Sequence, residues 1–267
     1  MRIIVCIKQV PETKSVKMDE KTGTVIRKGV QAIINPLDLY AIESALILKE
    51  KYGAETIALS MGPPQAVEAL KEAMAMGINQ AVLVSDKAFA GSDTWATAYI
   101  LAAAIRKSGG GDLILCGERA TDGDTGQVGP ELAATLDLPV ATYVNAIESI
   151  ESGHCRVRRL VENGVEELNV QLPGVITVVK EVGEPRLPTL RGKLRAKAAE
   201  IKILTLAELD VDKKMIGLEG SPTRVVKIFR PQVTRNGKIV HVADEKQLAA
   251  ATEEFFNFLH TRGVDLP

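Results

Sequence analysis

Residues 113–130, LILCGERATDGDTGQVGP, decide the fold. The stretch opens with a short apolar run at 113–116, typical of a buried strand, and leads into a helix-compatible run at 128–136. The polar segment between them is rich in small residues, including Gly117, Gly123, Gly126 and Thr125. Such a strand, loop and helix start form a cradle for phosphate groups in many α/β proteins, because free N–H groups at the helix start face the loop.

This loop has two other interpretations. A glycine-rich connection between a strand and a helix often does no more than turn the chain. Asp122, Asp124 and Gly126 also resemble the start of a calcium loop. That loop needs an oxygen ligand at 126 and a glutamate at 133, where the chain has Gly126 and Ala133, so the sequence argues against calcium.

Composition excludes several classes of function. The 267 residues carry a net charge of −1, which gives no case for nucleic acid or an anionic membrane surface. Cys6, Cys116 and Cys155 are odd in number and widely spaced, which is neither a disulfide framework nor a zinc pattern. The chain opens on an apolar strand, and no run approaches the roughly 20 apolar residues of a membrane span. We therefore expect a cytoplasmic protein without a signal peptide or transmembrane segment.

Strands and helices alternate in the first half of the chain. We expect strands at 2–7, 56–60, 81–85, 112–116 and 139–143, and helices at 35–52, 66–76 and 92–107. This order predicts an α/β fold with a doubly wound parallel sheet. In such sheets a ligand lies at the carboxyl ends of the strands, where the strand order reverses. If the first and fourth strands are neighbours, this point collects residues 6–8 and 117–128, with 35–38 and 61–62 at its rim.

Some residues near this point have ordinary structural explanations. Asn35 is a suitable N-cap, Pro36 suits the first helical position, and Asp38 is an acid in the first turn, so capping alone would explain them. Cys6 and Cys116 end adjacent strands. A thiol couple is one interpretation there, and two small buried apolar side chains are the favoured one.

The second half of the chain has a different pattern of polar and apolar residues. Residues 146–151, 155–160, 165–171 and 175–179 alternate in polarity, with hairpin signals at 152–153 and 163–164, which predicts a β meander. An exposed loop at 184–190 and a basic helix at 191–202 follow. The tail has extended sequence and an amphipathic helix at 244–259, and it is too thin for its own core. We expect it to be an arm packed on another chain.

Several separated segments resemble the β subunit of electron-transfer flavoproteins. They are VCIKQVP at 5–11, Asn35-Pro36 before a helix, SMGP at 60–63, AMAMG at 73–77, the 117–128 loop, and EPR at 184–186 before Thr189-Leu190. The resemblance covers essentially the whole chain. It implies a Rossmann-like nucleotide-binding domain at 1–205 and a C-terminal arm at 206–267. The arm embraces a larger α subunit that holds a redox-active FAD, which residues 9–13 approach.

The resemblance also implies particular site residues. The nucleotide contacts fall on Cys6, Asn35, Pro36, Leu37, Asp38, Met61, Gly117, Arg119, Ala120, Asp122, Gly123, Asp124, Thr125, Gly126, Gln127 and Val128. Thr94, in AFAGSDTW at 88–95, reaches the isoalloxazine ring. The partner-recognition loop at 184–198, with Glu184, Arg186 and Leu190, docks on dehydrogenases. No catalytic residue is expected, because the flavin carries the redox chemistry.

The form of the loop distinguishes two branches of that family. Single-flavin members hold AMP and typically carry three aspartates in a row, followed by a bulkier residue and Asn-Gln. This chain has DGDTGQ at 122–127, which resembles the bifurcating and nitrogen-fixation-associated branch, whose β subunit binds a second FAD. Gly123 in place of a carboxylate lowers the repulsion that a pyrophosphate would meet. In that branch the β-FAD takes a hydride from NADH. One electron passes to the α-FAD and an acyl-CoA dehydrogenase-type partner, and the other to ferredoxin or flavodoxin.

Two alternatives are kept open. One is an AMP-binding structural β subunit, in which the nucleotide only stabilises the fold. The other is a stand-alone nucleotide-binding regulator, which is disfavoured because the chain lacks a long Gly-x2-Gly-x9-Gly-Ser phosphate run.

Overall fold

The computed structural model describes residues 1–12, 17–18, 25–26, 32–226 and 237–264. They belong to two compact units, Met1–Ile228 and Phe229–Pro267, which are described separately. The expected long connection at 12–32 falls mostly outside the described residues. The described parts of that region are two short antiparallel pairs, β2 (Gln9–Pro11) with β5 (Ala32–Ile34) and β3 (Lys17–Met18) with β4 (Val25–Ile26).

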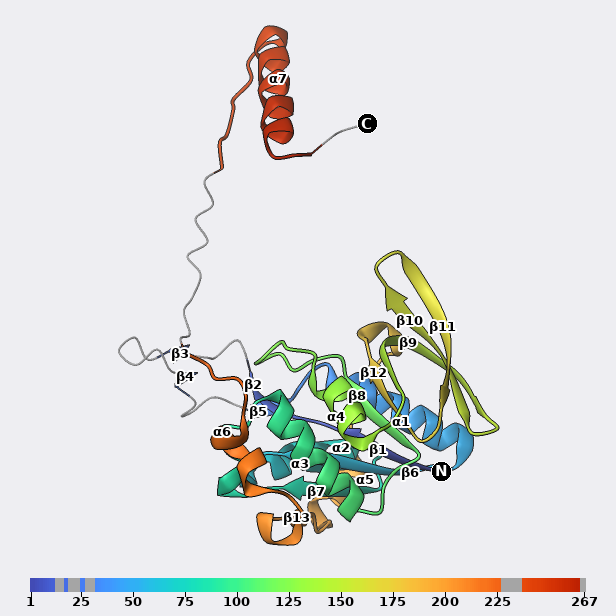
Figure 1. The fold of residues 1–267 in the computed structure, drawn as a ribbon. Coiled ribbons are helices and arrows are strands. Elements are labelled where there is room, and N and C mark those ends of the chain that lie inside the picture. Colours follow the sequence, from blue (N-terminus) through green and yellow to red (C-terminus); the bar gives the residue numbers. More distant parts are fainter. Residues whose placement is uncertain (13–16, 19–24, 27–31, 227–236, 265–267) are drawn as a thin grey trace. The chain divides into compact units, whose positions relative to one another are not determined.

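A nine-stranded sheet forms the centre of the described part of the first unit (Figure 1). Its order is β11-β10-β9-β12-β8-β1-β6-β7-β13. In chain order the strands are β1 (Arg2–Cys6), β6 (Glu55–Met61), β7 (Gln80–Val84), β8 (Leu113–Gly117), β9 (Val140–Glu151), β10 (His154–Val161), β11 (Gly164–Gln171), β12 (Gly174–Val178) and β13 (Lys202–Leu204). The neighbours from β9 to β13 pair in parallel, whereas β9, β10 and β11 are antiparallel.

Helices cover both faces of the parallel part of the sheet. They are α1 (Asp38–Tyr52), α2 (Val67–Met76), α3 (Thr94–Lys107), α4 (Val128–Leu136), α5 (Leu190–Ala198) and the short α6 (Gly217–Gly220). Alternate residues of β1 divide between two cores. Ile3 and Val5 pack with α1 and α2, and Ile4 and Cys6 pack with α3 and α4. A strand buried on both faces explains the continuous apolar run, and the expected doubly wound α/β fold is confirmed.

The expected meander was wrong in two respects. Residues 139–143 and 146–151 form one strand, β9, which pairs first with β12 and then with β10. Residues 175–179 were expected as a fourth meander strand, but β12 lies between β9 and β8 in the parallel sheet. Every residue of β12 is buried, as expected of a central parallel strand. Its continuous apolar run is therefore typical of its true position in the parallel sheet. The meander therefore has three strands.

Two helix boundaries also differ from the expectation. Asn35 is not the N-cap of α1, which begins at Asp38 after Leu37 and has no side-chain cap. The basic helix α5 ends at Ala198, and Lys202, expected within it, begins β13. The predicted end of α1 at residue 52 is confirmed, and Gly53 follows it with a φ of 67°, a left-handed conformation that glycine accepts at low cost.

The tail divides between the two units. Residues 206–226 belong to the first unit, where Leu209, Ile216 and Ser221 are buried. In the second unit, α7 (Glu245–Thr261) confirms the predicted helix, and the Asp244 side chain caps it by accepting the Gln247 N–H at 2.8 Å. Among the described residues, no helix has both the length and the apolar character needed to cross a bilayer.

Candidate functional site

The candidate site lies at the carboxyl ends of β1 and β8. These first and fourth parallel strands of the chain are neighbours, as expected, and Cys6 stands opposite Cys116. The other neighbour of β1 is β6, so the strand order reverses at β1. The connections that leave β1 and β8 open a ligand-binding crevice at such a point.

A buried carboxyl group joins the two strand ends. Asp38 Oδ2 accepts the Lys8 N–H at 2.7 Å, and Oδ1 accepts the Asn35 amide at 2.9 Å. Burial raises the pKa of Asp38 to about 7, although these donors and the Gly117 N–H lower it. A Cβ at residue 117 would stand 2.4 Å from Asp38 Oδ1 and 2.8 Å from the Leu37 carbonyl oxygen. Gly117 therefore allows the end of β8 to lie against the start of α1.

Asn35 links the loop after β8 to the junction of β8 and α1 through hydrogen bonds. Its side chain is fully buried. The amide nitrogen also donates to the Arg119 carbonyl at 2.8 Å, and the amide oxygen accepts the Thr121 N–H at 3.1 Å. The polarity of Asn35 therefore serves contacts with the loop rather than the helix cap that the sequence predicted.

The 118–127 loop is folded by its own backbone and by ion pairs. The Ala120 carbonyl accepts the N–H groups of Gly123 at 3.3 Å and Asp124 at 2.7 Å. Lys8 Nζ lies 2.7 Å from Asp122, and Arg119 Nε lies 2.8 Å from Asp124. Apart from Gly123 and its two chain neighbours, no atom of the described residues lies within 4 Å of where a Cβ at Gly123 would stand. The two carboxylates that flank this open position are thus each paired with a cation.

The starts of α3 and α4 meet beside the loop. The first N–H groups of a helix have no acceptor inside the helix, and Gln127, which precedes α4, gives them no side-chain cap. The Thr94 hydroxyl, in the first residue of α3, donates to Glu131 Oε1 at 3.1 Å and lies 3.5 Å from Gln127 Oε1. Glu131 Oε2 is buried without a hydrogen-bond partner in the part of the chain that the structure describes, and burial raises the pKa of this carboxyl group.

The other expected nucleotide residues lie around the same strand ends. Met61 ends β6 and is half-buried against the core that contains α3, and Pro36 is exposed. Cys6 and Cys116 are both free and buried. The pKa of Cys116 is raised well above its ordinary value by its contact with Cys6 and by burial, so its thiol stays protonated. This environment is that of small apolar side chains, as favoured above.

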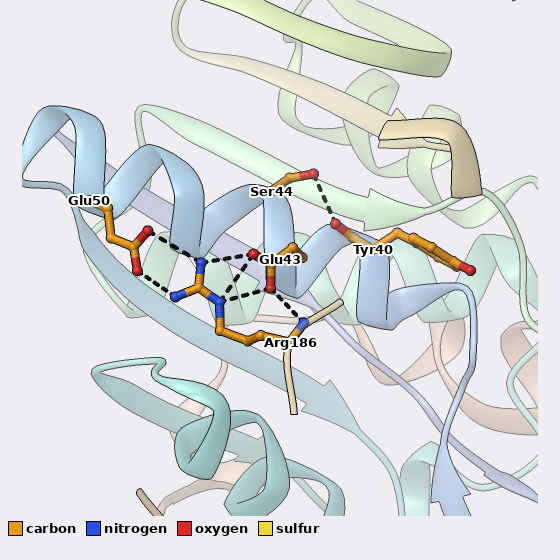
Figure 2. A network of polar contacts seen from close by, with 5 residues as sticks. All are labelled: Tyr40, Glu43, Ser44, Glu50 and Arg186. Atoms are coloured by element: carbon orange, nitrogen blue, oxygen red, sulfur yellow. Dashed lines mark hydrogen bonds and ion pairs between the residues drawn. The ribbon is translucent and has the colours of Figure 1, made fainter. Parts of the chain in front are cut away.

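The expected partner-recognition residues lie on a second surface, where Arg186 contacts α1. Glu184 is exposed, and Leu190, the first residue of α5, is 76% exposed. Figure 2 shows that the Arg186 guanidinium faces α1, where Glu43 and Glu50 bind it. The guanidinium is therefore already paired within this chain.

Sequence reasoning missed Glu131, Glu43 and Glu50 at these two surfaces, and it placed Lys8 at the strand end without predicting its partner. Lys8 and Glu131 pair with predicted site residues, and Glu43 and Glu50 pair with Arg186. A signal existed for the last two, because residues seven apart on a helix lie on nearly the same face. No local pattern identifies the partners of Lys8 and Glu131, which come from distant parts of the chain.

Comparisons with known proteins agree with this architecture. The family model described as "Electron transfer flavoprotein domain" matches residues 22–209. The electron transfer flavoprotein subunit beta of Thermoanaerobacterium thermosaccharolyticum is 48% identical over 90% of this chain and 92% of its own. The caffeyl-CoA reductase-Etf complex subunit CarD of Acetobacterium woodii is 47% identical over 90% and 92%, and protein FixA of Azotobacter vinelandii is 42% identical over 94% and 92%. The chain therefore belongs to the family of electron transfer flavoprotein β subunits.

Proposed function

We propose that this chain binds FAD at the 117–128 loop and acts in a heterodimer with a flavoprotein α subunit. The observation that carries the proposal is the open position at Gly123 between two paired carboxylates, Asp122 and Asp124. A mononucleotide needs no room beyond its phosphate, whereas a dinucleotide continues past it. A small, uncharged residue at this point favours a dinucleotide, because no side-chain charge repels its second phosphate.

The residues present fit such a ligand. The free N–H groups at the start of α4 and the Thr125 hydroxyl supply donors for a pyrophosphate. Lys8 and Arg119 supply positive charge close to the loop. Thr94 and Gln127 would bind polar edges of the flavin ring, and Cys6, Met61 and residues 35–38 would surround the adenosine half. Bound FAD would supply acceptance of a hydride and release of single electrons.

We place the chain in an electron-bifurcating system. NADH is the proposed donor, and the α-subunit FAD with an acyl-CoA dehydrogenase-type partner is the higher-potential route. Ferredoxin or flavodoxin is the low-potential acceptor. The similarity to CarD and FixA supports this branch. Residues 184–198 are the proposed docking loop for the dehydrogenase. Residues 1–205 are the proposed nucleotide domain, and residues 206–267 are the proposed arm on the α subunit. The proposed site of action is the cytoplasm.

Anaerobic turnover of the purified αβ heterodimer tests this function. We expect NADH to reduce ferredoxin only when an acyl-CoA dehydrogenase and its enoyl-CoA substrate are also present, because the favourable transfer drives the unfavourable one. Oxidation of NADH with both acceptors present and no reduced ferredoxin would contradict bifurcation.

A structural β subunit that holds AMP is the second candidate. The observation in its favour is that carboxylates stand on both sides of Gly123, and the Asp124 side chain is 71% exposed. In that case the nucleotide stabilises the fold without redox chemistry. The nucleotide content of the heterodimer separates the two candidates.

A further inference from the structure

Arg186 fastens the base of the 184–190 loop to α1 (Figure 2). Its Nη2 donates to Glu43 Oε1 at 2.8 Å and its Nε to Oε2 at 2.9 Å. The backbone N–H of the same residue donates to Glu43 Oε2 at 3.0 Å. Its Nη1 pairs with Glu50, which lies about two helical turns further along α1 on nearly the same face. Both the backbone and the side chain of Arg186 are therefore held by one helix.

The Glu43 contact is the more buried of the two. The Glu43 side chain is only 7% exposed, whereas that of Glu50 is 61% exposed. Losing the partner of a buried carboxylate leaves an uncompensated charge, but an exposed ion pair contributes little. A guanidinium binds a carboxylate through two parallel N–H groups, which fixes orientation as well as distance, and lysine cannot reproduce this.

A second anchor holds the other end of the loop. The Thr189 hydroxyl accepts the Gly192 N–H at 2.9 Å and caps α5. A Cβ at Gly192 would stand 2.0 Å from the Ala75 carbonyl oxygen, so α5 packs directly on α2. Arg195 donates to the Met74 carbonyl at 2.8 Å. Residues 187 and 188 are therefore fixed from both sides.

Exposed leucines lie in and just after this doubly anchored segment. Leu187 and Leu190 are 86% and 76% exposed, and Leu194 is 64% exposed. Docking of a free loop costs conformational entropy, and a loop that is already ordered avoids much of that cost. The anchoring of residue 186 therefore bears directly on how well these leucines could engage a partner.

We propose that Arg186 is a positioning residue, which orders the docking loop through Glu43 and does not itself bind the partner. The functional part rests on the docking role of residues 184–198 proposed above. The guanidinium is directed at α1, and the apolar side chains, not the cation, are available to a partner protein with an apolar pocket.

Hydrogen–deuterium exchange on the αβ heterodimer tests the ordering. Arg186→Lys and Glu43→Gln should each speed amide exchange in peptides covering 184–192 by about tenfold, which equals about 1.4 kcal/mol of opening free energy. Glu50→Gln should change it less than either. Arg191→Lys is the matched control, since this neighbouring arginine is exposed and the same chemical change should leave exchange unaltered. Equal exchange in wild type and both Arg186→Lys and Glu43→Gln would overturn the proposal.

Electron transfer to a purified acyl-CoA dehydrogenase tests the consequence. Arg186→Lys should raise the KM for the dehydrogenase about tenfold and leave kcat and the flavin content unchanged, because the exposed leucines still bind once ordered. If Arg186 instead contacts the partner, its substitution will raise KM without faster exchange, which contradicts the proposal. Leu190→Ala isolates the docking role. An unchanged KM in that variant refutes docking at this loop, and the exchange experiment still decides whether Arg186 orders it.

Discussion

A carboxyl group enclosed at residue 38 and a missing side chain at residue 123 set the electrostatics of the candidate site. Asp38 is almost fully buried and holds the ends of β1 and β8 together through backbone N–H groups. Gly123 has no side chain, so no third carboxylate stands between those of Asp122 and Asp124. Each residue can be changed alone with a clear electrostatic expectation.

Substitution of Gly123 by aspartate should weaken FAD retention by the β subunit by at least about tenfold, since two like charges a few ångströms apart repel by several kcal/mol. In the part of the chain that the structure describes, nothing beyond the two chain neighbours lies near the new Cβ, so the fold should tolerate the side chain. The measurement is flavin content of the heterodimer after gel filtration, and the α-FAD should stay in place. Gly123→Asn is the control of equal size without charge. Undiminished flavin in Gly123→Asp would refute our account of the loop.

Substitution of Asp38 by asparagine should change the pH dependence of stability. Burial raises the folded-state pKa of Asp38 to about 7 from 3.8, so the fold favours its protonated form. The stability that this protonation contributes is present at low pH and is lost as pH rises towards 7, at up to about 1.4 kcal/mol per pH unit. Wild type should therefore lose stability relative to Asp38→Asn between pH 5 and 7.5. Thermal unfolding of both heterodimers measures this, and parallel profiles would contradict the raised pKa.

At the level of a single element, the 118–127 loop combines backbone turns with two ion pairs. Lys8 comes from the segment after β1, and Arg119 belongs to the loop itself. Both pairs are partly exposed, so each contributes little to stability, with a median of about 0–1 kcal/mol. Their proposed importance lies in the charge that the ligand meets.

Two substitutions that break the same ion pair should act in opposite directions. Lys8→Met removes a positive charge from the loop and should weaken nucleotide retention several-fold. Asp122→Asn removes a negative charge and should strengthen it by a similar factor. Dissociation rates of the β-site nucleotide from the heterodimer provide the measurement. If the pair serves only to fold the loop, both variants will release the nucleotide faster.

The sequence predicted the parallel elements better than their pairing partners. Continuous apolar runs identified β1, β6, β7 and β8, since each is buried on both faces. The same type of run in β12 was assigned to the meander, because neighbouring segments alternate and sequence proximity favours pairing with them. Asn35 has the pattern of a cap, yet its partners Arg119 and Thr121 lie more than 80 residues away. Long-range hydrogen bonds of this kind leave no local signal.

At the scale of the whole molecule, α1 connects the two proposed surfaces. Asp38 begins the helix at the candidate nucleotide site, and Glu43 and Glu50 on the same helix hold the proposed docking loop. The second unit contributes α7, whose Phe255, Phe256 and Phe258 are each about half exposed. Exposed aromatic residues in such number are typical of a surface that another protein covers.

Replacement of Phe255, Phe256 and Phe258 by alanine should weaken association with the α subunit by at least about tenfold, because aromatic anchors dominate most interfaces. Alanine preserves helix propensity, so α7 should stay helical. Size-exclusion chromatography of the co-expressed subunits across a dilution series measures the effect. Asn257→Ala is the control on the same helix. A heterodimer as stable as wild type would show that these side chains do not form the subunit contact.

The proposed function requires that the 117–128 loop holds a dinucleotide flavin. The most direct measurement is the identity and amount of nucleotide released by heat from the purified αβ heterodimer. We expect two FAD for each heterodimer and no AMP. One FAD with one AMP would contradict it.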